Sequence, residues 1–327
     1  MLKLKGSIKI SGDKSISHRA LIFAALSTGN TKISNLLESN DVMSTLEILR
    51  NLGIKINKEG NDWIVFGNGT SGFIEPKKPL DCGNSGTTAR LMIGAVASNP
   101  IKCTFVGDKS LSKRSMSRVT NYLEEIGSQI NITRNDYLPL MIEGNDELLP
   151  LKHDVLKPSA QIKSALILAA LNISGKSEIT EKVQTRDHTE RMMKYLKIKF
   201  KTSKLKNGGK KIELNGPYEI KSKNINIASD PSSAAFFIVA ALILPGSKIE
   251  LKNISLNPTR IAFIQILKKM GGKIRIKRTR NLSGEVVGNV YAQYSILKGI
   301  SIKSSLAPML IDEYPIIAIA ATQAKGK

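Results

Sequence analysis

Charged and polar residues, together with one glycine, gather at the predicted starts of helices in this sequence. They are Lys14, Ser15, Arg19, Asn84, Ser85, Gly86, Thr87, Arg90, Arg114, Ser159, Gln161, Lys163, Arg186, Asp187, His188, Asp230, Ser232, Ser233, Arg260, Asp312 and Glu313. A helix N-terminus presents free N–H groups and a partial positive charge, so it favours anions. Cations and hydroxyls placed there are typical ligands of phosphates and carboxylates, and a carboxylate can accept a proton. If these helix starts meet in space, they predict a site for a substrate with several anionic groups.

Each of these features also has an ordinary structural explanation. The turn GNSGTT could be a helix start capped by Ser and Thr, and it is not a Walker A motif because no GK[ST] follows at the required spacing. Lys14 and Arg19 could be solvated charges, and Asp230 and Asp312 could be N-caps. His188 fits a hydrogen-bonded structural residue better than a catalytic base. The functional interpretation depends on complementary chemistry at equivalent positions of a repeat.

The elements that must position these residues form such a repeat. Ala-rich apolar helices are predicted near residues 14, 83, 158, 230 and 312, and their pairs of small residues recur about every 70–80 residues. Each complete copy continues with a strand, a second helix and two further strands. We therefore expect a βαβαββ unit whose first strand lies just before the Ala-rich helix. The small residues predict helices packed about a common axis with sheets outside; the alternative is an ordinary doubly wound sheet.

The repeat separates two stretches that look alike. GDKSISHR at 12–19 opens the first helix of a copy, whereas GDKSLSKR at 107–114 follows a strand and opens a second helix. They are therefore not one duplicated element. The first stretch predicts ligand contacts from Lys14, Ser15 and Arg19, and the second predicts one from Arg114 alone. Lys109 is expected to be a solvated lysine.

Length and composition narrow the class of protein. The 327 residues suffice for two domains, and no apolar run approaches the ~18 residues of a membrane span. The start of the chain has no secretory pattern, which predicts a cytoplasmic protein. The net charge of +22 attracts anions, but aromatic residues make up only 5%, so no stacking surface for nucleic acid is expected. Cys82 and Cys103 are predicted to be buried free thiols, and His18, His153 and His188 have no metal-ligand spacing.

Seven motifs carry a family resemblance. They are GDKSISHRALIFAAL, DCGNSGTTARL, DKSLSKRSM, PSAQIKSALILAAL, TRDHTERM, SDPSSAAFF and IDEYPIIAIAA, and they extend along the whole chain. In these motifs and their order the chain resembles the 5-enolpyruvylshikimate-3-phosphate (EPSP) synthases, or 3-phosphoshikimate 1-carboxyvinyltransferases. The resemblance implies transfer of the enolpyruvyl group of phosphoenolpyruvate to the 5-hydroxyl of shikimate 3-phosphate, through a tetrahedral ketal phosphate, with release of phosphate. It implies no metal or organic cofactor. We further expect no nucleic-acid or membrane partner, and a monomer.

The resemblance also implies the architecture. The expected fold class is α/β, an inside-out α/β barrel of repeated βαβαββ units in two domains with the active site in the cleft. Residues 14–227 would form a complete first domain of three units. Residues 1–13 plus 228–327 would form an incomplete second domain of about one and a half units. The family's later Lys-Glu-Ser-Asp-Arg and Gly-Asp-His-Arg motifs are not found, so we expect a C-terminally incomplete chain with very low turnover.

The matching motifs imply roles for ten residues. Those expected at shikimate 3-phosphate are Lys14, Ser15, Arg19, Ser159, Ala160, Gln161, Arg186 and Asp312, and those expected at phosphoenolpyruvate are Lys14, Gly86, Arg114 and Gln161. Asp312 would accept the proton of the attacking hydroxyl, and Lys14 would act in catalysis beside it. Gly86 would let the backbone approach phosphoenolpyruvate. Arg114 would grip the same substrate, since arginine binds such groups in a bidentate manner.

Other interpretations stay open from the sequence. The SAQ and RDHTE variants resemble the bacterial branch that includes glyphosate-tolerant members. Asn84, Gly86 and Thr87 match the sensitive form, so we expect an intact version of the protein to be sensitive to glyphosate. The sister transferase acting on UDP-N-acetylglucosamine is disfavoured because Ser15 follows Lys14 and the 107–116 loop has no Cys. The remaining alternatives are an RNA-binding or RNA-processing relative and a catalytically impaired fragment that only binds substrate.

Overall fold

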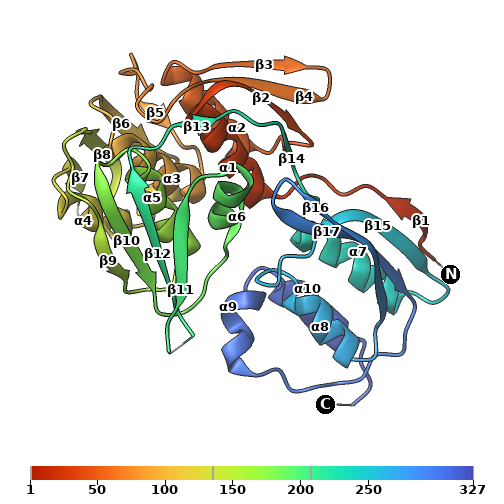
Figure 1. The fold of residues 1–327 in the computed structure, drawn as a ribbon. Helices are drawn as coiled ribbons and strands as arrows, with labels where there is room; N and C mark the ends of the chain where they lie inside the picture. Colours follow the sequence, from red (N-terminus) through yellow and green to blue (C-terminus); the bar gives the residue numbers. More distant parts are fainter. Residues whose placement is uncertain (1, 135, 207, 327) are drawn as a thin grey trace. The chain divides into compact units, whose positions relative to one another are not determined.

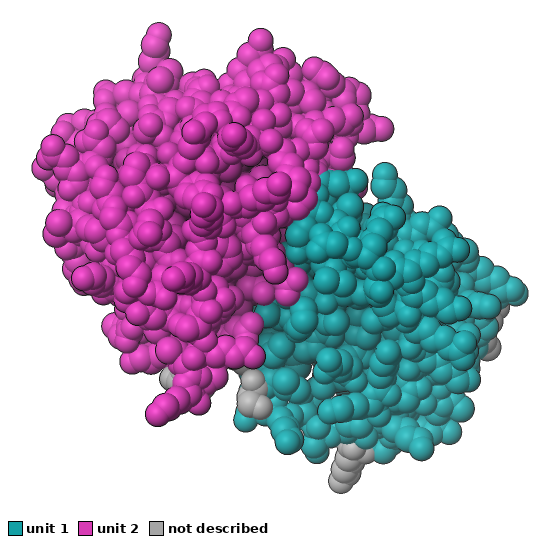
Figure 2. Space-filling model, in the orientation of Figure 1, with its two compact units in different colours: residues 1–13, 226–327 teal, residues 14–225 magenta. Residues whose placement is uncertain are grey.

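The computed structural model describes residues 2–134, 136–206 and 208–326 of the chain (Figure 1). The chain divides into two compact units, which Figure 2 draws in different colours. Unit 1 comprises residues 1–13 and 226–327, and unit 2 comprises residues 14–225. Both units are built from the same succession of elements, which the repeat in the sequence predicts.

Unit 2 contains three successive copies of the repeat. The first consists of α1 (Lys14–Ala25), β2 (Ser27–Ser34), α2 (Asn40–Asn51), β3 (Lys55–Glu59) and β4 (Asp62–Asn68). The second consists of β5 (Leu80–Asp81), α3 (Gly86–Ala97), β6 (Lys102–Val106), the 3-10 turn η1 (Leu111–Lys113), α4 (Ser117–Glu124), β7 (Gln129–Arg134) and β8 (Tyr137–Glu143). The third consists of β9 (Lys152–Val155), α5 (Ala160–Ala170), β10 (Gly175–Glu181), α6 (His188–Tyr195), β11 (Phe200–Lys204) and β12 (Lys210–Gly216), after which come β13 (Ile220–Lys221) and β14 (Ile225–Asn226).

Unit 1 contains a fourth copy and the first helix of a fifth. Its elements are β1 (Lys5–Ile8), α7 (Pro231–Ile243), β15 (Lys248–Ser255), α8 (Ala262–Lys269), β16 (Lys273–Leu282) and β17 (Glu285–Gln293), followed by η2 (Ser304–Leu306), α9 (Ala307–Leu310) and α10 (Tyr314–Thr322). The core of this unit gathers apolar residues of α7, α8, α10 and the sheet, including Phe263 and Leu267. The α/β class predicted from the sequence is therefore confirmed.

Each copy has its own small mixed sheet with one strand order. The sheets run β13-β2-β4-β3, β5-β6-β8-β7, β9-β10-β12-β11 and β1-β15-β17-β16. Within each of these orders the first strand pairs in parallel with the second, and the two later pairs are antiparallel; β14 also pairs with β2 in the sheet of the first copy. Four small sheets of this kind are incompatible with the single doubly wound sheet that we considered as the alternative.

The first strand of a copy does not always precede its helix in the chain. In the second and third copies it does, as predicted. In the first and fourth copies the prediction is wrong. Strand β1, which precedes α1, pairs with β15 and is the first strand of the fourth copy, whereas the strand that pairs in parallel with β2 is β13. Since a strand of two to four residues is stabilised by whichever sheet edge it meets, its sheet cannot be inferred from its place in the sequence.

A glycine at or next to the end of the last strand allows the sheet to contact the helix closely in each copy of unit 2. A Cβ on Gly67 would lie 2.2 Å from the carbonyl oxygen of Ala24, and one on Gly144 would lie 2.0 Å from that of Asn99. A Cβ on Gly216 would lie 2.4 Å from the carbonyl oxygen of Ile173. The backbone of each last strand therefore lies directly against the end of the first helix, where only glycine fits.

Two further expectations concern cysteines and membrane segments. Cys82 and Cys103 are buried free thiols, as predicted. Burial raises the pKa of both, that of Cys103 to about 12, so neither is a reactive thiolate near neutral pH. Within the described ranges, no helix is long and apolar enough to cross a membrane.

Candidate active site

Helix α1 begins with the predicted Lys14 and Ser15. The Lys14 ammonium lies 3.0 Å from Oδ2 of Asp41 near the start of α2, and its side chain remains 50% exposed. The carbonyl oxygen of Ser15 accepts a hydrogen bond of 3.0 Å from Nη1 of Arg19. Lys14 therefore stands at a helix N-terminus with its charge accessible, as an anion ligand requires.

Arg19 is buried and joins three helices of unit 2. Its Nε donates to Thr189 Oγ1 on α6 and its Nη2 donates to Ser164 Oγ on α5, both at 2.7 Å. Only 4% of the residue is exposed, so the alternative of a solvated surface charge is wrong. Arg19 thus fixes the start of α1 against α5 and α6.

A second chain of hydrogen bonds links α1, α2 and α3. The Nδ1 atom of the fully buried His18 lies 2.8 Å from Thr45 Oγ1, which lies 2.7 Å from Thr88 Oγ1. Thr88 is in the first turn of α3, whose N-cap Ser85 accepts from the Thr88 N–H at 3.1 Å. His18 and Thr88 are one and two residues away from the predicted ligands Arg19 and Gly86, so this chain of bonds holds the first turns of α1 and α3 against the middle of α2.

Gln161 connects the starts of α3 and α5. Its Nε2 donates to Thr87 Oγ1 at 2.9 Å, and its Oε1 accepts from Nη1 of Arg90 at 2.9 Å. A Cβ on Gly86, the first residue of α3, would lie 2.8 Å from the same Nη1 atom of Arg90. The structure thus brings together Gly86 and Gln161, which the motifs assign to one substrate.

Arg114 lies beside the Gly-rich turn that precedes α3. Its Nη2 donates to Asn84 Oδ1 at 3.0 Å and to Ser110 Oγ at 3.2 Å. Asn84 in turn donates to Asp108 Oδ2 at 2.6 Å. This bond, the backbone N–H groups of Leu111 and Ser110 and the nearby Arg114 hold the pKa of Asp108 below its usual range. Asp108 thereby anchors the loop that carries Arg114, while Lys109 is exposed, as predicted.

Cations crowd this end of unit 2. Burial, followed by the charges of Arg118 and Arg114, lowers the pKa of Arg90. Like charges that disfavour one another are stabilised when an anion binds among them. The electrostatics therefore favour an anionic ligand near Arg90, Arg114 and the start of α3.

The third copy supplies Ser159, Ala160 and Arg186. Ser159 is the N-cap of α5 and accepts from the N–H of Ile162 at 3.4 Å, and Ala160 is the first residue of the helix. Arg186 is half-buried and lies two residues before α6. All the predicted ligands except Asp312 therefore belong to unit 2, at the starts of α1, α3 and α5 or in the loops before α4 and α6.

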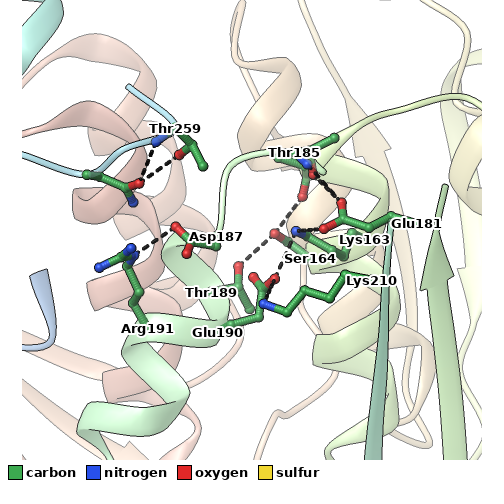
Figure 3. Close-up of polar contacts among 12 residues, drawn as sticks. Lys163, Ser164, Glu181, Thr185, Asp187, Thr189, Glu190, Arg191, Lys210 and Thr259 are labelled. Carbon is green, nitrogen blue, oxygen red and sulfur yellow. Dashed lines mark hydrogen bonds and ion pairs between the residues drawn. The ribbon is translucent and has the colours of Figure 1, made fainter. Parts of the chain in front are cut away.

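Sequence reasoning missed the role of Lys163, which it counted only as a cation near a helix start. This side chain is fully buried; its ammonium donates to Glu181 Oε1 at 3.0 Å and lies 2.9 Å from Glu190 Oε1 (Figure 3). The available signal was a lysine inside the apolar run QIKSALILAAL, followed by acids in the next strand and helix. A lysine at such a position is buried only when it is paired.

Asp312 belongs to unit 1 and lies next to a buried acidic cluster. Asp312 is exposed, but the neighbouring Glu313 is 1% exposed and accepts a hydrogen bond from the Ser232 hydroxyl. Arg260 donates to Ser232 Oγ at 2.8 Å and to Asp13 Oδ2 at 2.9 Å. Burial alone would lower the pKa of Arg260, but Asp13, Asp230, Glu313 and Asp312 raise it overall.

The two helix-start aspartates of unit 1 differ. Asp230 is the N-cap of α7, and its Oδ1 accepts from the N–H of Ser232 at 2.7 Å, which confirms the capping interpretation for this residue. The N-cap position of α10 is occupied by Glu313, so the same interpretation is wrong for Asp312. Among the described residues, no group of three or more His, Cys, Asp or Glu side chains could hold a metal ion.

Comparisons with known proteins agree with this geometry. The family described as EPSP synthase (3-phosphoshikimate 1-carboxyvinyltransferase) matches residues 1–327. The 3-phosphoshikimate 1-carboxyvinyltransferase of Sphingopyxis alaskensis is 44% identical over 99% of this chain and 74% of its own length. That of Bacillus cytotoxicus is 46% identical over 99% of this chain and 75% of its own length. The chain thus spans about three quarters of the length of these relatives.

Solved structures give the same result. The EPSP synthase structure from Acinetobacter baumannii superposes with a TM-score of 0.91 at 37% identity, covering 99% of this chain and 72% of that one. The enolpyruvyl transferase NikO from Streptomyces tendae has a TM-score of 0.75 at 14% identity, which shows the fold alone. With a family match along its whole length and relatives above 40% identity, the chain belongs to the EPSP synthase family.

Proposed function

We propose that this chain catalyses transfer of the enolpyruvyl group from phosphoenolpyruvate to the 5-hydroxyl of shikimate 3-phosphate, with release of phosphate. The observation that carries the proposal is the hydrogen-bonded junction of α1, α3 and α5, where Arg19, Gln161 and Thr87 join helix starts that bear the family's ligand motifs. Family membership disfavours the RNA-binding alternative. A monomer acting in the cytoplasm stays the expectation from the sequence.

The finer architecture is also a proposal. The three copies of unit 2 would form a complete inside-out α/β barrel over residues 14–227, with α1, α3 and α5 inside and the sheets outside. Support comes from the burial of nearly every residue of these three helices. Residues 1–13 plus 228–327 would begin a second domain of the same design.

The shikimate 3-phosphate site is assigned to the residues around α1, α5 and the loop before α6. Lys14, Ser15, Ser159, Ala160, Gln161 and Arg186 would surround the ligand. Arg19 belongs to the same site, but because it is buried it would act mainly through Ser15, Ser164 and Thr189, whose oxygens it binds. Lys14 and Arg186 would balance the charge of one phosphate group directly.

The phosphoenolpyruvate site is assigned to Lys14, Gly86, Arg114 and Gln161. Arg114 is exposed and held by Asn84 and Ser110, so its guanidinium is oriented before a ligand binds. The absence of a side chain on Gly86 leaves room beside Arg90 and Arg114. Gln161 lies at the start of α5 and hydrogen-bonds to Thr87 and Arg90 of α3, so it would contact both substrates.

The chemistry needs a proton acceptor for the 5-hydroxyl as its oxygen attacks the enol carbon of phosphoenolpyruvate. We assign this role to Asp312, which carries an exposed carboxylate. Addition of the oxygen to the enol carbon and of a proton to the methylene carbon gives a tetrahedral ketal phosphate. Loss of phosphate from that carbon and of a proton from the new methyl group then forms the enol ether. Lys14 and Arg114 would stabilise the negative charge of the phosphate as it leaves.

A binding experiment tests the proposed function. Calorimetry of the 327-residue chain is expected to detect shikimate 3-phosphate with higher affinity than shikimate. Arg186→Met should weaken binding of shikimate 3-phosphate by about tenfold, because a charge-assisted contact to phosphate is lost, and should leave shikimate binding unchanged. Lys109→Met, at an exposed lysine, is the matched control and should match the unmodified chain. Equal affinities for the two ligands, or an Arg186→Met variant that binds both as before, would contradict the assignment.

The reaction itself is measured as phosphate released from phosphoenolpyruvate. Release should require shikimate 3-phosphate. A single-turnover format, with protein in excess over phosphoenolpyruvate, detects even slow release. Phosphate release that is the same with and without shikimate 3-phosphate would argue against enolpyruvyl transfer.

Gly86→Ala tests the phosphoenolpyruvate site through the inhibitor glyphosate. The new Cβ would lie 2.8 Å from Nη1 of Arg90, a flexible group that can shift, so the fold should tolerate the change. Glyphosate binding in the presence of shikimate 3-phosphate should weaken about tenfold, because one methyl group intrudes into the ligand space. Titrations of both proteins by calorimetry provide the measurement. Unchanged glyphosate affinity would remove Gly86 from the site, and shikimate 3-phosphate binding to the same variant serves as the control.

A further inference from the structure

The buried Lys163 ammonium is the centre of a polar cluster in unit 2. It lies between Glu181, at the end of β10, and Glu190, in the first turn of α6 (Figure 3). These two carboxylates are 2% and 4% exposed, and Lys210 approaches Glu190 at 3.6 Å from β12. A buried cluster of this kind holds its side chains in one arrangement, because a buried charge that loses its partners destabilises the fold.

Glu181 connects the buried Lys163 to the loop before α6. Its Oε1 accepts from Lys163, and its Oε2 accepts from Thr185, from the backbone N–H at 3.1 Å and from the hydroxyl at 2.6 Å. The preceding residues 182–184 are exposed. Thr185 is therefore the place where the loop returns to the protein interior, one residue before Arg186.

The neighbouring residues extend the same cluster toward the other proposed ligands. Ser164 follows Lys163 on α5, and its Oγ lies 2.7 Å from Thr189 Oγ1, next to Glu190. Both hydroxyls accept from Arg19. The pairs 163–164 and 189–190 thus clamp α5 to α6, two residues after Gln161 and three residues after Arg186.

We propose that the chain of contacts from Lys163 through Glu181 to Thr185 positions Arg186, and thereby sets the preference of this site for a phosphorylated over an unphosphorylated ligand. This inference rests on the proposed function, in which Arg186 contacts the 3-phosphate. Lys163, Glu181 and Thr185 touch no ligand; they act through Arg186 as positioning residues.

The physical reason is preorganisation. A long, half-buried side chain such as that of Arg186 loses conformational freedom when it binds a phosphate, and this loss subtracts from affinity. A loop already held at Thr185 by two hydrogen bonds to a buried carboxylate loses less. A ligand without the phosphate gains nothing from Arg186, so its affinity is independent of the chain of contacts.

Thr185→Val tests the inference, with Thr185→Ser as its matched control. Valine keeps the shape of threonine but removes the hydroxyl donor to Glu181, whereas serine keeps the donor. Calorimetry of the full 327-residue chain measures the dissociation constants of shikimate 3-phosphate and of shikimate. We expect Thr185→Val to weaken shikimate 3-phosphate binding about five- to tenfold with shikimate unchanged, and Thr185→Ser to stay within about twofold of the unmodified chain.

The outcomes separate the inference from the proposed function. If Arg186→Met weakens shikimate 3-phosphate binding but Thr185→Val does not, the function stands and the positioning role is refuted. Equal weakening of both ligands by Thr185→Val also refutes it, because a general structural defect does not distinguish them. If the unmodified chain binds both ligands equally, or Arg186→Met has no effect, the proposed function itself fails.

Discussion

Replacing Lys163 with methionine is expected to lower the free energy of unfolding by about 3–5 kcal/mol, because the change leaves the buried carboxylate of Glu181 without its cation and that of Glu190 with only Lys210, 3.6 Å away. Glu181 and Glu190 are 2% and 4% exposed, so water cannot replace the ammonium at either of them. Methionine fills nearly the same space as lysine, and thus the loss reports charge rather than a cavity. Urea unfolding followed by circular dichroism measures the difference.

A triple variant is the control for this explanation. In Lys163→Met combined with Glu181→Gln and Glu190→Gln, no carboxylate remains uncompensated, and most of the lost stability should return. Lys176→Met removes an exposed lysine that pairs with Glu178 and Glu213, and its unfolding midpoint should stay unchanged. A triple variant as unstable as the single one would show that the lysine stabilises the fold through something other than its charge.

Local signals made the elements of the repeat predictable. The Ala-rich helices lie where the sequence places them, for example α1 at Lys14–Ala25 and α5 at Ala160–Ala170. Apolar periodicity and caps such as Ser159 are properties of short segments, so they can be read without knowing the fold. Which segment of the chain forms the first strand of each sheet could not be predicted in this way. Strand β13 has two residues, and its pairing with β2 depends on the path of the whole of unit 2.

The residues of the candidate site that belong to a family motif could be predicted from the sequence. The charged residues that are buried by long-range packing could not. Lys14, Gly86 and Arg114 lie at helix starts or in the loops expected for them. The burial of Arg19 and Lys163 was not foreseen, since a charged residue in a helix is usually solvated. Their partners Thr189 and Glu190 are 170 and 27 residues away along the chain. A pattern within one helix or strand does not reveal pairs this far apart in the sequence. Long-range pairing of this kind appears only in the folded structure.

Replacing Gly94 with alanine is expected to lower the free energy of unfolding by about 3 kcal/mol, at the upper end of the usual range for an overpacked core. A Cβ at this position would lie 2.2 Å from the carbonyl oxygen of Ala165 and 2.7 Å from its Cα. Both are backbone atoms, so α3 and α5 must move apart as whole helices. The intrinsic gain of alanine over glycine within a helix, about 1 kcal/mol, offsets only part of this cost.

Gly86→Ala provides a control within the same helix. There the nearest atom is the end of the Arg90 side chain, which can move, so stability should change by less than about 1 kcal/mol. The two variants differ in what they do to the site, because separating α3 from α5 also stretches the Gln161–Thr87 and Gln161–Arg90 hydrogen bonds. Gly94→Ala should therefore lose shikimate 3-phosphate affinity together with stability, whereas Gly86→Ala should lose neither. If Gly94→Ala proves as stable as Gly86→Ala, the close contact of α3 and α5 does not hold the ligand-bearing helix starts together.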